Sequence, residues 1–260
     1  MKLLRLFGAI FVMSLKQHLA FRTNLLFQFL LVVTATGSAL FAVEIVYTRT
    51  ETLGGWPAGE TIVLIGTFTI VSGVLSAFIE PNVLWFNQRI TSGELDDVLL
   101  KPVSSLFLAS LGRHSPFGLI QIIVGTIVVT WGMRELGTGF EVLNGLTWLT
   151  LLLTSFGLTW ASRVLIAMLA LWVPGLSLDV VYGGLWQFGR YPVTIYRRPV
   201  RFVLTWVMPL AVITTLPARA LTRGVGAPVL ALSLGIGVAA VVIVQAVWNA
   251  GLRRYTSATS

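Results

Sequence analysis

The one dense group of acidic residues in the sequence lies between two long apolar runs, in ITSGELDDVLLKPVSS at residues 90–105. Clustered carboxylates can serve catalysis or bind a metal, but such sites usually draw on histidine, cysteine or a nucleophile as well. The chain has two histidines and no cysteine, which excludes a thiolate site and disfavours a multi-histidine centre. We therefore expect no metal site here, and the stretch is either a docking surface or a solvated loop.

The spacing within this stretch predicts a short amphipathic helix at residues 92–101. Thr91, followed three residues later by a glutamate, has the spacing of a capping box, and Pro102 would end the helix. Asp97 and Lys101 are placed for an i,i+4 ion pair. A helix with one apolar and one charged face can bind in a partner's groove. The predicted docking residues are Gly93, Glu94, Leu95, Asp96, Asp97, Leu99, Leu100, Lys101 and Pro102.

Three ionisable residues lie in or beside other apolar runs: Arg163, Glu80 and Asp179. Charges inside a bilayer are costly and are candidates for function. One explanation pairs Arg163 with Asp179 or Glu80 inside a helix bundle, and the other gives these residues contact with a substrate or a role in proton coupling. They do not form the histidine–carboxylate set or the nucleophile–base pair of an intramembrane enzyme. We therefore expect no enzyme activity in this chain.

The composition indicates that a membrane surrounds these residues. Of 260 residues, 56% are hydrophobic and 11% are charged, whereas about a quarter are charged in a typical soluble domain. A span of the bilayer core, about 30 Å, needs about 20 helical residues. The chain then has room for about six spans and no sizeable soluble domain. Its formal charge of +8 suits cytoplasmic loops and anionic lipid rather than nucleic acid.

The apolar runs predict an all-α membrane protein with a single domain at residues 1–260. At residues 1–22, Lys2, Arg5 and Lys16 form one basic stripe, which favours an amphipathic helix in the membrane interface. The alternative is that this segment extends the first span. The expected spans are about residues 25–46, 61–86, 116–133, 145–173, 178–196 and 227–250.

The segment at residues 200–223 carries arginines near both ends and prolines inside, which disfavours a straight crossing. Counts of lysine and arginine in the short loops place both termini and the acidic stretch in the cytoplasm. The number of crossings is then even, and a re-entrant hairpin at 200–223 satisfies this. The alternative lets residues 200–222 cross and keeps 178–196 in the interface.

Four stretches carry a resemblance to a known family, and together they extend along the chain: Phe21–Asn24, GELDDVLLKPV at Gly93–Val103, YPVTIY to MPLAVITTLPARAL at Tyr191–Leu221, and WNAGLRRYTSA at Trp248–Ala258. The chain resembles the small six-span membrane subunits of bacterial ABC-2 type exporters. The resemblance implies that residues 92–101 are a coupling helix for a nucleotide-binding subunit. It also implies that residues 200–223 are re-entrant on the outer side.

The resemblance further implies a permease subunit in the bacterial plasma membrane that forms half of a pathway. Its partners would be an ABC ATPase subunit and a second permease subunit, as a homodimer or a related heterodimer. No GxxxxGK[ST] stretch is present, so ATP and magnesium would be bound by the partner and no cofactor by this chain. The alternatives are a proton-coupled carrier without a motor and a membrane assembly protein.

Overall fold

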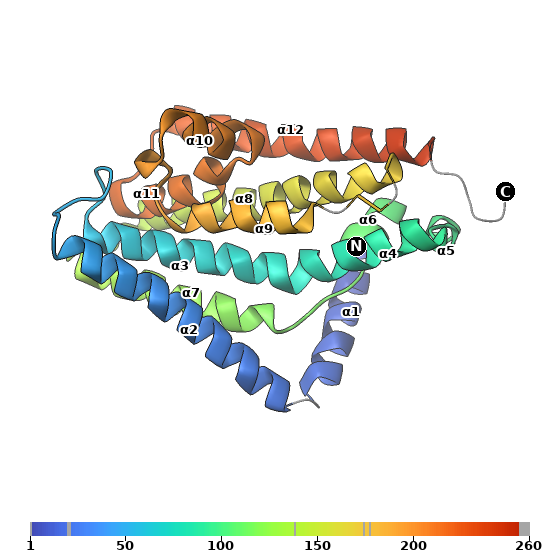
Figure 1. Ribbon diagram of the computed structural model, residues 1–260, viewed down its shortest axis with the longest axis horizontal. Coiled ribbons are helices and arrows are strands. Elements are labelled where there is room, and N and C mark those ends of the chain that lie inside the picture. The colour runs from blue at the N-terminus through green and yellow to red at the C-terminus, as the bar shows by residue number, and fades with distance from the viewer. Residues whose placement is uncertain (1, 20–21, 138, 174, 177, 255–260) are drawn as a thin grey trace.

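The computed structural model is a bundle of helices (Figure 1) and describes residues 2–19, 22–137, 139–173, 175–176 and 178–254. Within these ranges there is no β-strand beyond an isolated bridge between Leu53 and Trp56. The α-helices are α1 (Lys2–Leu19), α2 (Arg22–Tyr47), α3 (Ala58–Val74), α4 (Glu80–Ser92), α5 (Asp96–Leu99), α6 (Ser105–Leu111), α7 (Gly118–Glu135), α8 (Val142–Met168), α9 (Asp179–Gln187), α10 (Arg198–Phe202), α11 (Leu216–Arg223) and α12 (Ala227–Leu252).

Short π-helical and 3₁₀ segments connect or extend several of these helices. The π-helical segment Leu75–Ile79 joins α3 to α4, so one helix runs without a break from Ala58 to Ser92. The others are the π-helical segments Val203–Val207 and Ala211–Thr215 and the 3₁₀ turns Leu169–Leu171, Phe188–Arg190 and Val193–Ile195. The all-α class expected from the sequence is therefore observed.

Four helices in the described part of the chain are long and apolar enough to cross a membrane: Thr23–Tyr47, Ala58–Ser92, Val142–Leu171 and Ala227–Leu252. The expected span at 116–133 corresponds to α7, which has 18 residues and ends with Arg134 and Glu135. Residues 178–196 do not form the single helix that was expected. Only the nine residues of α9 are α-helical there, and two 3₁₀ turns follow, because glycines and Pro192 interrupt the segment.

The chain direction can be followed from contacts at the two ends of the bundle. We name these the α5 end, which also holds α6 and the last turn of α12, and the α11 end, which holds the loop after α2 (Figure 1). Asp179 contacts Arg163 of α8, and Thr194 donates a hydrogen bond to the Gly54 carbonyl at the α11 end. Residues 179–196 therefore run from the level of Arg163 to the α11 end.

Helices α3 and α7 pack at backbone contact through glycines spaced seven residues apart on both helices. A Cβ atom added to Gly66 would lie 2.7 Å from the Val129 nitrogen, and one added to Gly125 would lie 2.7 Å from the Gly66 carbonyl oxygen. Only glycine permits this approach, as in other close helix pairs of membrane proteins. The six glycines meet in three layers, Gly59 with Gly132, Gly66 with Gly125 and Gly73 with Gly118.

Helix α1 lies at a steep angle to the long axis of the bundle, near its α5 end (Figure 1). Phe7 and Phe11 pack against Phe78 and against His114, which is 5% exposed. Helix α1 does not extend α2 in a straight line, which was the alternative considered from the sequence. Of its basic residues, Arg5 and Lys16 are exposed, and the side chain of Lys2 lies outside the described residues.

The segment Arg198–Arg223 consists of two helical halves, Arg198–Val207 and Ala211–Arg223, which are bent by 77°. Both of its ends contact the α11 end of the bundle. Arg201 donates hydrogen bonds to the carbonyls of Thr194 and Tyr196. Arg223 donates to the Gly55 carbonyl at 2.7 Å. The bend lies at Met208 and Pro209, where the backbone becomes extended and the proline cannot donate.

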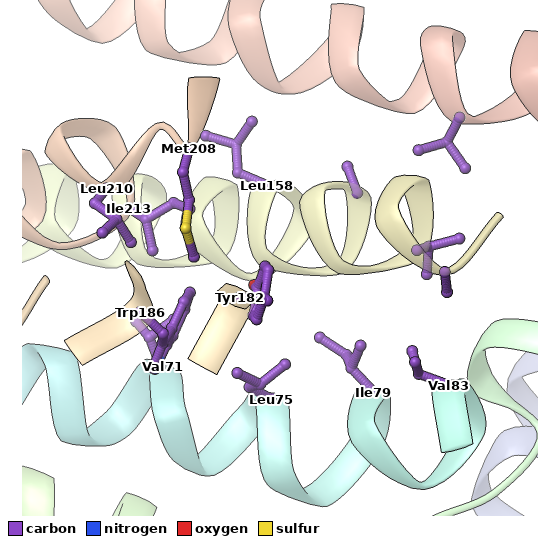
Figure 2. Close-up of a cluster of buried hydrophobic side chains, with 14 of the residues drawn as sticks. Val71, Leu75, Ile79, Val83, Leu158, Tyr182, Trp186, Met208, Leu210 and Ile213 are labelled. Carbon is purple, nitrogen blue, oxygen red and sulfur yellow. The ribbon is translucent and has the colours of Figure 1, made fainter. Parts of the chain in front are cut away.

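A buried apolar cluster holds the bent segment and α9 against the long helices. Figure 2 shows Val71, Leu75 and Ile79 on the α3–α4 helix facing side chains from α8, from α9 and from the bent segment. Its other labelled members are Val83, Leu158, Tyr182, Trp186, Met208, Leu210 and Ile213. The Trp186 indole nitrogen also donates to the Ser72 hydroxyl at 2.9 Å. One face of α3–α4 therefore positions both irregular segments.

Candidate functional site

The acidic loop, residues 93–102, does not contain the ten-residue helix expected at 92–101. Helix α4 continues to Ser92 and ends at Gly93, whose φ of 71° is the left-handed conformation that glycine favours. The amide of Glu94 then donates to the Arg89 carbonyl, and the Thr91 hydroxyl donates to the Asn87 carbonyl instead of capping a new helix. What remains is the single turn of α5.

The two faces of the acidic loop also differ from expectation. The apolar side, Leu95 and Val98, is buried in the protein's own core, so it is not available to a partner. Asp97 pairs with Arg89 at 3.0 Å rather than with Lys101, and Glu94 pairs with the same guanidinium at 3.1 Å. The residues that point outward are Glu94, Asp97, Lys101, Pro102 and Leu100, the last of which is 84% exposed.

The second candidate site joins Arg163, Glu80 and Asp179, which we call the Arg163 cluster. The guanidinium binds both oxygens of Glu80, at 2.9 and 3.0 Å, and one oxygen of Asp179 at 2.5 Å. The Arg163 side chain is 2% exposed, whereas each carboxylate side chain is about 30% exposed. The ring of Tyr182 lies 4.9 Å below the guanidinium. Three helices, α4, α8 and α9, are thus linked by one buried cation.

A second ion pair, in which only the carboxylate is buried, lies at the α11 end and was not expected from the sequence. Glu60 is 6% exposed and accepts a hydrogen bond from Arg223 at 2.6 Å. Glu60 and Glu80 lie on one continuous helix, 20 residues apart, which corresponds to about 30 Å. That distance equals the thickness of a bilayer core. The Glu60–Arg223 pair and the Arg163 cluster are therefore separated along this helix by about the thickness of one bilayer core.

Two cavities meet the Arg163 cluster, and its carboxylates divide between them. The first, which we call the vestibule, encloses about 510 Å³ at the α5 end and includes Asp179 in its lining. The second, which we call the groove, encloses about 370 Å³ farther toward the α11 end and includes Glu80. Arg163 lines neither cavity. The cluster therefore lies where the two cavities approach each other.

A polar stripe runs along α3–α4 through both cavities. Within each cavity its members lie three or four residues apart, except that Asn87 and Gln88 are adjacent, so most of them share one helix face. Seven residues, about two helical turns, separate Glu80 from Asn87. The stripe could have been recognised in the sequence from this spacing, as could the glycines that repeat on another face of the same helix. Its residues are Thr69, Ser72, Ser76 and Glu80 in the groove, then Asn87, Gln88 and Thr91 in the vestibule. Among the described residues, no group of three or more His, Asp or Glu could hold a metal ion.

Comparison with known families gives one finding. A family described as "ABC-2 family transporter protein" matches residues 32–259, which covers both candidate sites. No curated protein and no solved structure matches the chain.

Proposed function

Because the chain belongs to the ABC-2 family of transporter proteins, we propose that it is the membrane-spanning permease subunit of an ATP-driven exporter. Membrane proteins of this family typically work with a separate ATPase subunit. The proposed complex contains a second permease subunit, identical or related, and an ATPase that binds ATP and magnesium. The chain resides in the bacterial plasma membrane.

The outward side of the acidic loop is the observation that carries this proposal. Leu100 is 84% exposed, and the neighbouring side chains Glu94 and Asp97 are 60% and 71% exposed. An apolar side chain with charged neighbours matches the centre and rim of a protein interface. Leu95 and Val98 are buried and fix the loop to the bundle, so a force on the loop is passed directly to α4. An ATPase subunit would bind Leu100 in a pocket.

The experiment compares the same substitution at two exposed leucines, Leu100→Ala in the acidic loop and Leu143→Ala at the α11 end, which is 71% exposed. The tagged permease is purified from native membranes, and co-purified polypeptides are assayed for ATP hydrolysis and checked for a GxxxxGK[ST] motif. Truncation of an interface anchor typically costs more than about 1 kcal/mol. We expect Leu100→Ala to release most of the ATPase and Leu143→Ala to retain it. Equal retention by both variants would refute the docking role.

The proposal includes six crossings with both termini in the cytoplasm. Residues 179–196 would make the fifth crossing as a broken helix, which is tolerated in a membrane where the backbone is packed against protein. Residues 198–223 would enter and leave the membrane on the outer side. This is supported by the contacts of Arg201 and Arg223 at the same end of the bundle.

A further inference from the structure

Polar side chains line one part of the vestibule, and the charge on its described lining has one sign. Among the described residues of its lining, Asp179 is the only charged one, and it is accompanied by Asn87, Gln88 and Thr91. The Oδ1 atom of Asn87 is buried and has no hydrogen-bond partner. The side chains named here thus offer a carboxylate and an unused amide acceptor, which suit a positively charged group and disfavour an anion.

The groove continues this path on the other side of the Arg163 cluster. It contains hydroxyl and amide groups such as Ser72, Ser76 and Gln187 beside the aromatic rings of Phe68 and Trp186. A molecule with a polar head and an apolar body fits such a lining better than a wholly polar or wholly apolar one. A passage between the two cavities would have to pass the contact between Asp179 and Arg163.

We propose that the Arg163 cluster is the gate between the vestibule and the groove, and that the cargo is an amphipathic molecule with a cationic head. The proposal rests on the proposed function, because it assigns the substrate class and the gate of that exporter. The cationic head would enter the vestibule from the cytoplasm and replace the guanidinium on Asp179. Arg163 would remain with Glu80.

The geometry of the cluster determines which contact opens. Glu80 holds Arg163 through two hydrogen bonds, whereas Asp179 holds it through one. A bidentate contact fixes the guanidinium more firmly than a single one. Asp179 also begins α9, which has only nine residues, whereas Glu80 lies within a continuous helix of 35 residues. Release of Asp179 would therefore free the first turn of α9 from Arg163, while Tyr182 keeps the rest of α9 against α8 and Glu80 keeps α4 joined to α8.

The test uses two probes of similar shape and opposite charge, tetraphenylphosphonium and tetraphenylborate. Since the chain has no cysteine, Gln88→Cys places one thiol in the lining of the vestibule. The purified permease in a neutral detergent is labelled with a maleimide, with and without each probe. We expect the phosphonium to slow labelling and the borate to leave it unchanged. Equal protection by both probes, or protection by neither, would overturn the cationic assignment.

Asp179→Asn is the matched variant, with Glu44→Gln on α2 as the control. Loss of a close charge partner should weaken protection by the phosphonium by at least about tenfold in Asp179→Asn. In Glu44→Gln, the phosphonium should slow maleimide labelling as much as it does in the parent. In Asp179→Glu, the phosphonium should again slow labelling, because the carboxylate is retained. Undiminished protection in Asp179→Asn would refute the role of Asp179. Labelling without a probe reports whether each variant retains a reactive vestibule, and a variant that does not label is replaced by Asp179→Ser.

The outcome is independent of the docking test. The permease alone is used, so loss of ATPase binding in the previous experiment leaves the probe result unaffected. Protection by the phosphonium without any ATPase partner would keep the cation site and refute the ATP-driven exporter. Co-purification of the ATPase without protection by the phosphonium would keep the exporter and refute the cation site.

Discussion

Alanine substitutions at the α3–α7 contact give a stringent test of the packing. The variants are Gly66→Ala and Gly125→Ala, and the controls are Gly157→Ala in α8 and Gly235→Ala in α12. An added Cβ would meet backbone atoms at 2.7 Å at both contact positions, whereas nothing lies within 4 Å of it at the controls. Ordinary contact begins at 3.4 Å, so the helices would have to separate by about 0.7 Å, the difference between the two distances.

The variants at the α3–α7 contact and the two control variants should change the stability of the protein in opposite directions. Overpacking of this kind typically costs about 1–3 kcal/mol. Replacing an unconstrained helical glycine by alanine instead stabilises a helix by about 0.5–1 kcal/mol. Because Gly66 and Gly125 occupy one layer, separation caused by the first alanine makes room for the second. The double variant should therefore lose less stability than the sum of the two single variants.

Thermal unfolding in a mild detergent, followed by the loss of monodisperse protein, measures these changes. Gly66→Ala and Gly125→Ala should lower the unfolding midpoint, and Gly157→Ala and Gly235→Ala should leave it unchanged or raise it. The reasoning is refuted if all four variants shift the midpoint in the same direction by the same amount.

Two further predictions concern the charged residues. Arg163→Leu leaves the carboxylates of Glu80 and Asp179 without their cation and should lower the free energy of unfolding by roughly 3 kcal/mol. Adding Glu80→Gln and Asp179→Asn to this variant should recover part of the lost stability. No recovery would show that the arginine stabilises the fold through packing alone. Single cysteines at Arg198 and Arg219, both exposed, should react with an impermeant thiol reagent from the outside, and labelling from opposite sides would rule out the re-entrant arrangement.

The sequence predicted the all-α class, and one of its two explanations of Arg163 was a pairing with Asp179 or Glu80, because a lone charge in a bilayer is costly. In the structure Arg163 contacts both carboxylates. The sequence did not predict the helix boundaries around the acidic loop. Gly93 can precede a new helix or end the previous one. Which of the two forms depends on whether Leu95 and Val98 are buried in the core of the protein. That core is formed by distant segments, so local spacing alone did not predict it.

The pair formed by Glu60 and Arg223 was missed for a similar reason. Glu60 follows a glycine- and proline-rich loop and lies just outside the span predicted at residues 61–86, yet the structure places it in the first turn of α3 and buries it. Its partner is 163 residues away. A buried carboxylate next to an apolar run requires a cation, but five arginines in residues 197–223 were equally available. Only the bend of 77° brings Arg223 to it.

The faces of one continuous helix explain how the two proposed sites would act together. Its glycines pack against α7 at backbone distance, so α3 and α7 resist sliding past each other. Glu80 faces the Arg163 cluster, and the same helix ends at Ser92, 12 residues or about 18 Å from Glu80. The acidic loop follows directly. An ATPase that displaced the loop would therefore move Glu80, and the bidentate contact would carry Arg163 with it, which would strain the single contact to Asp179.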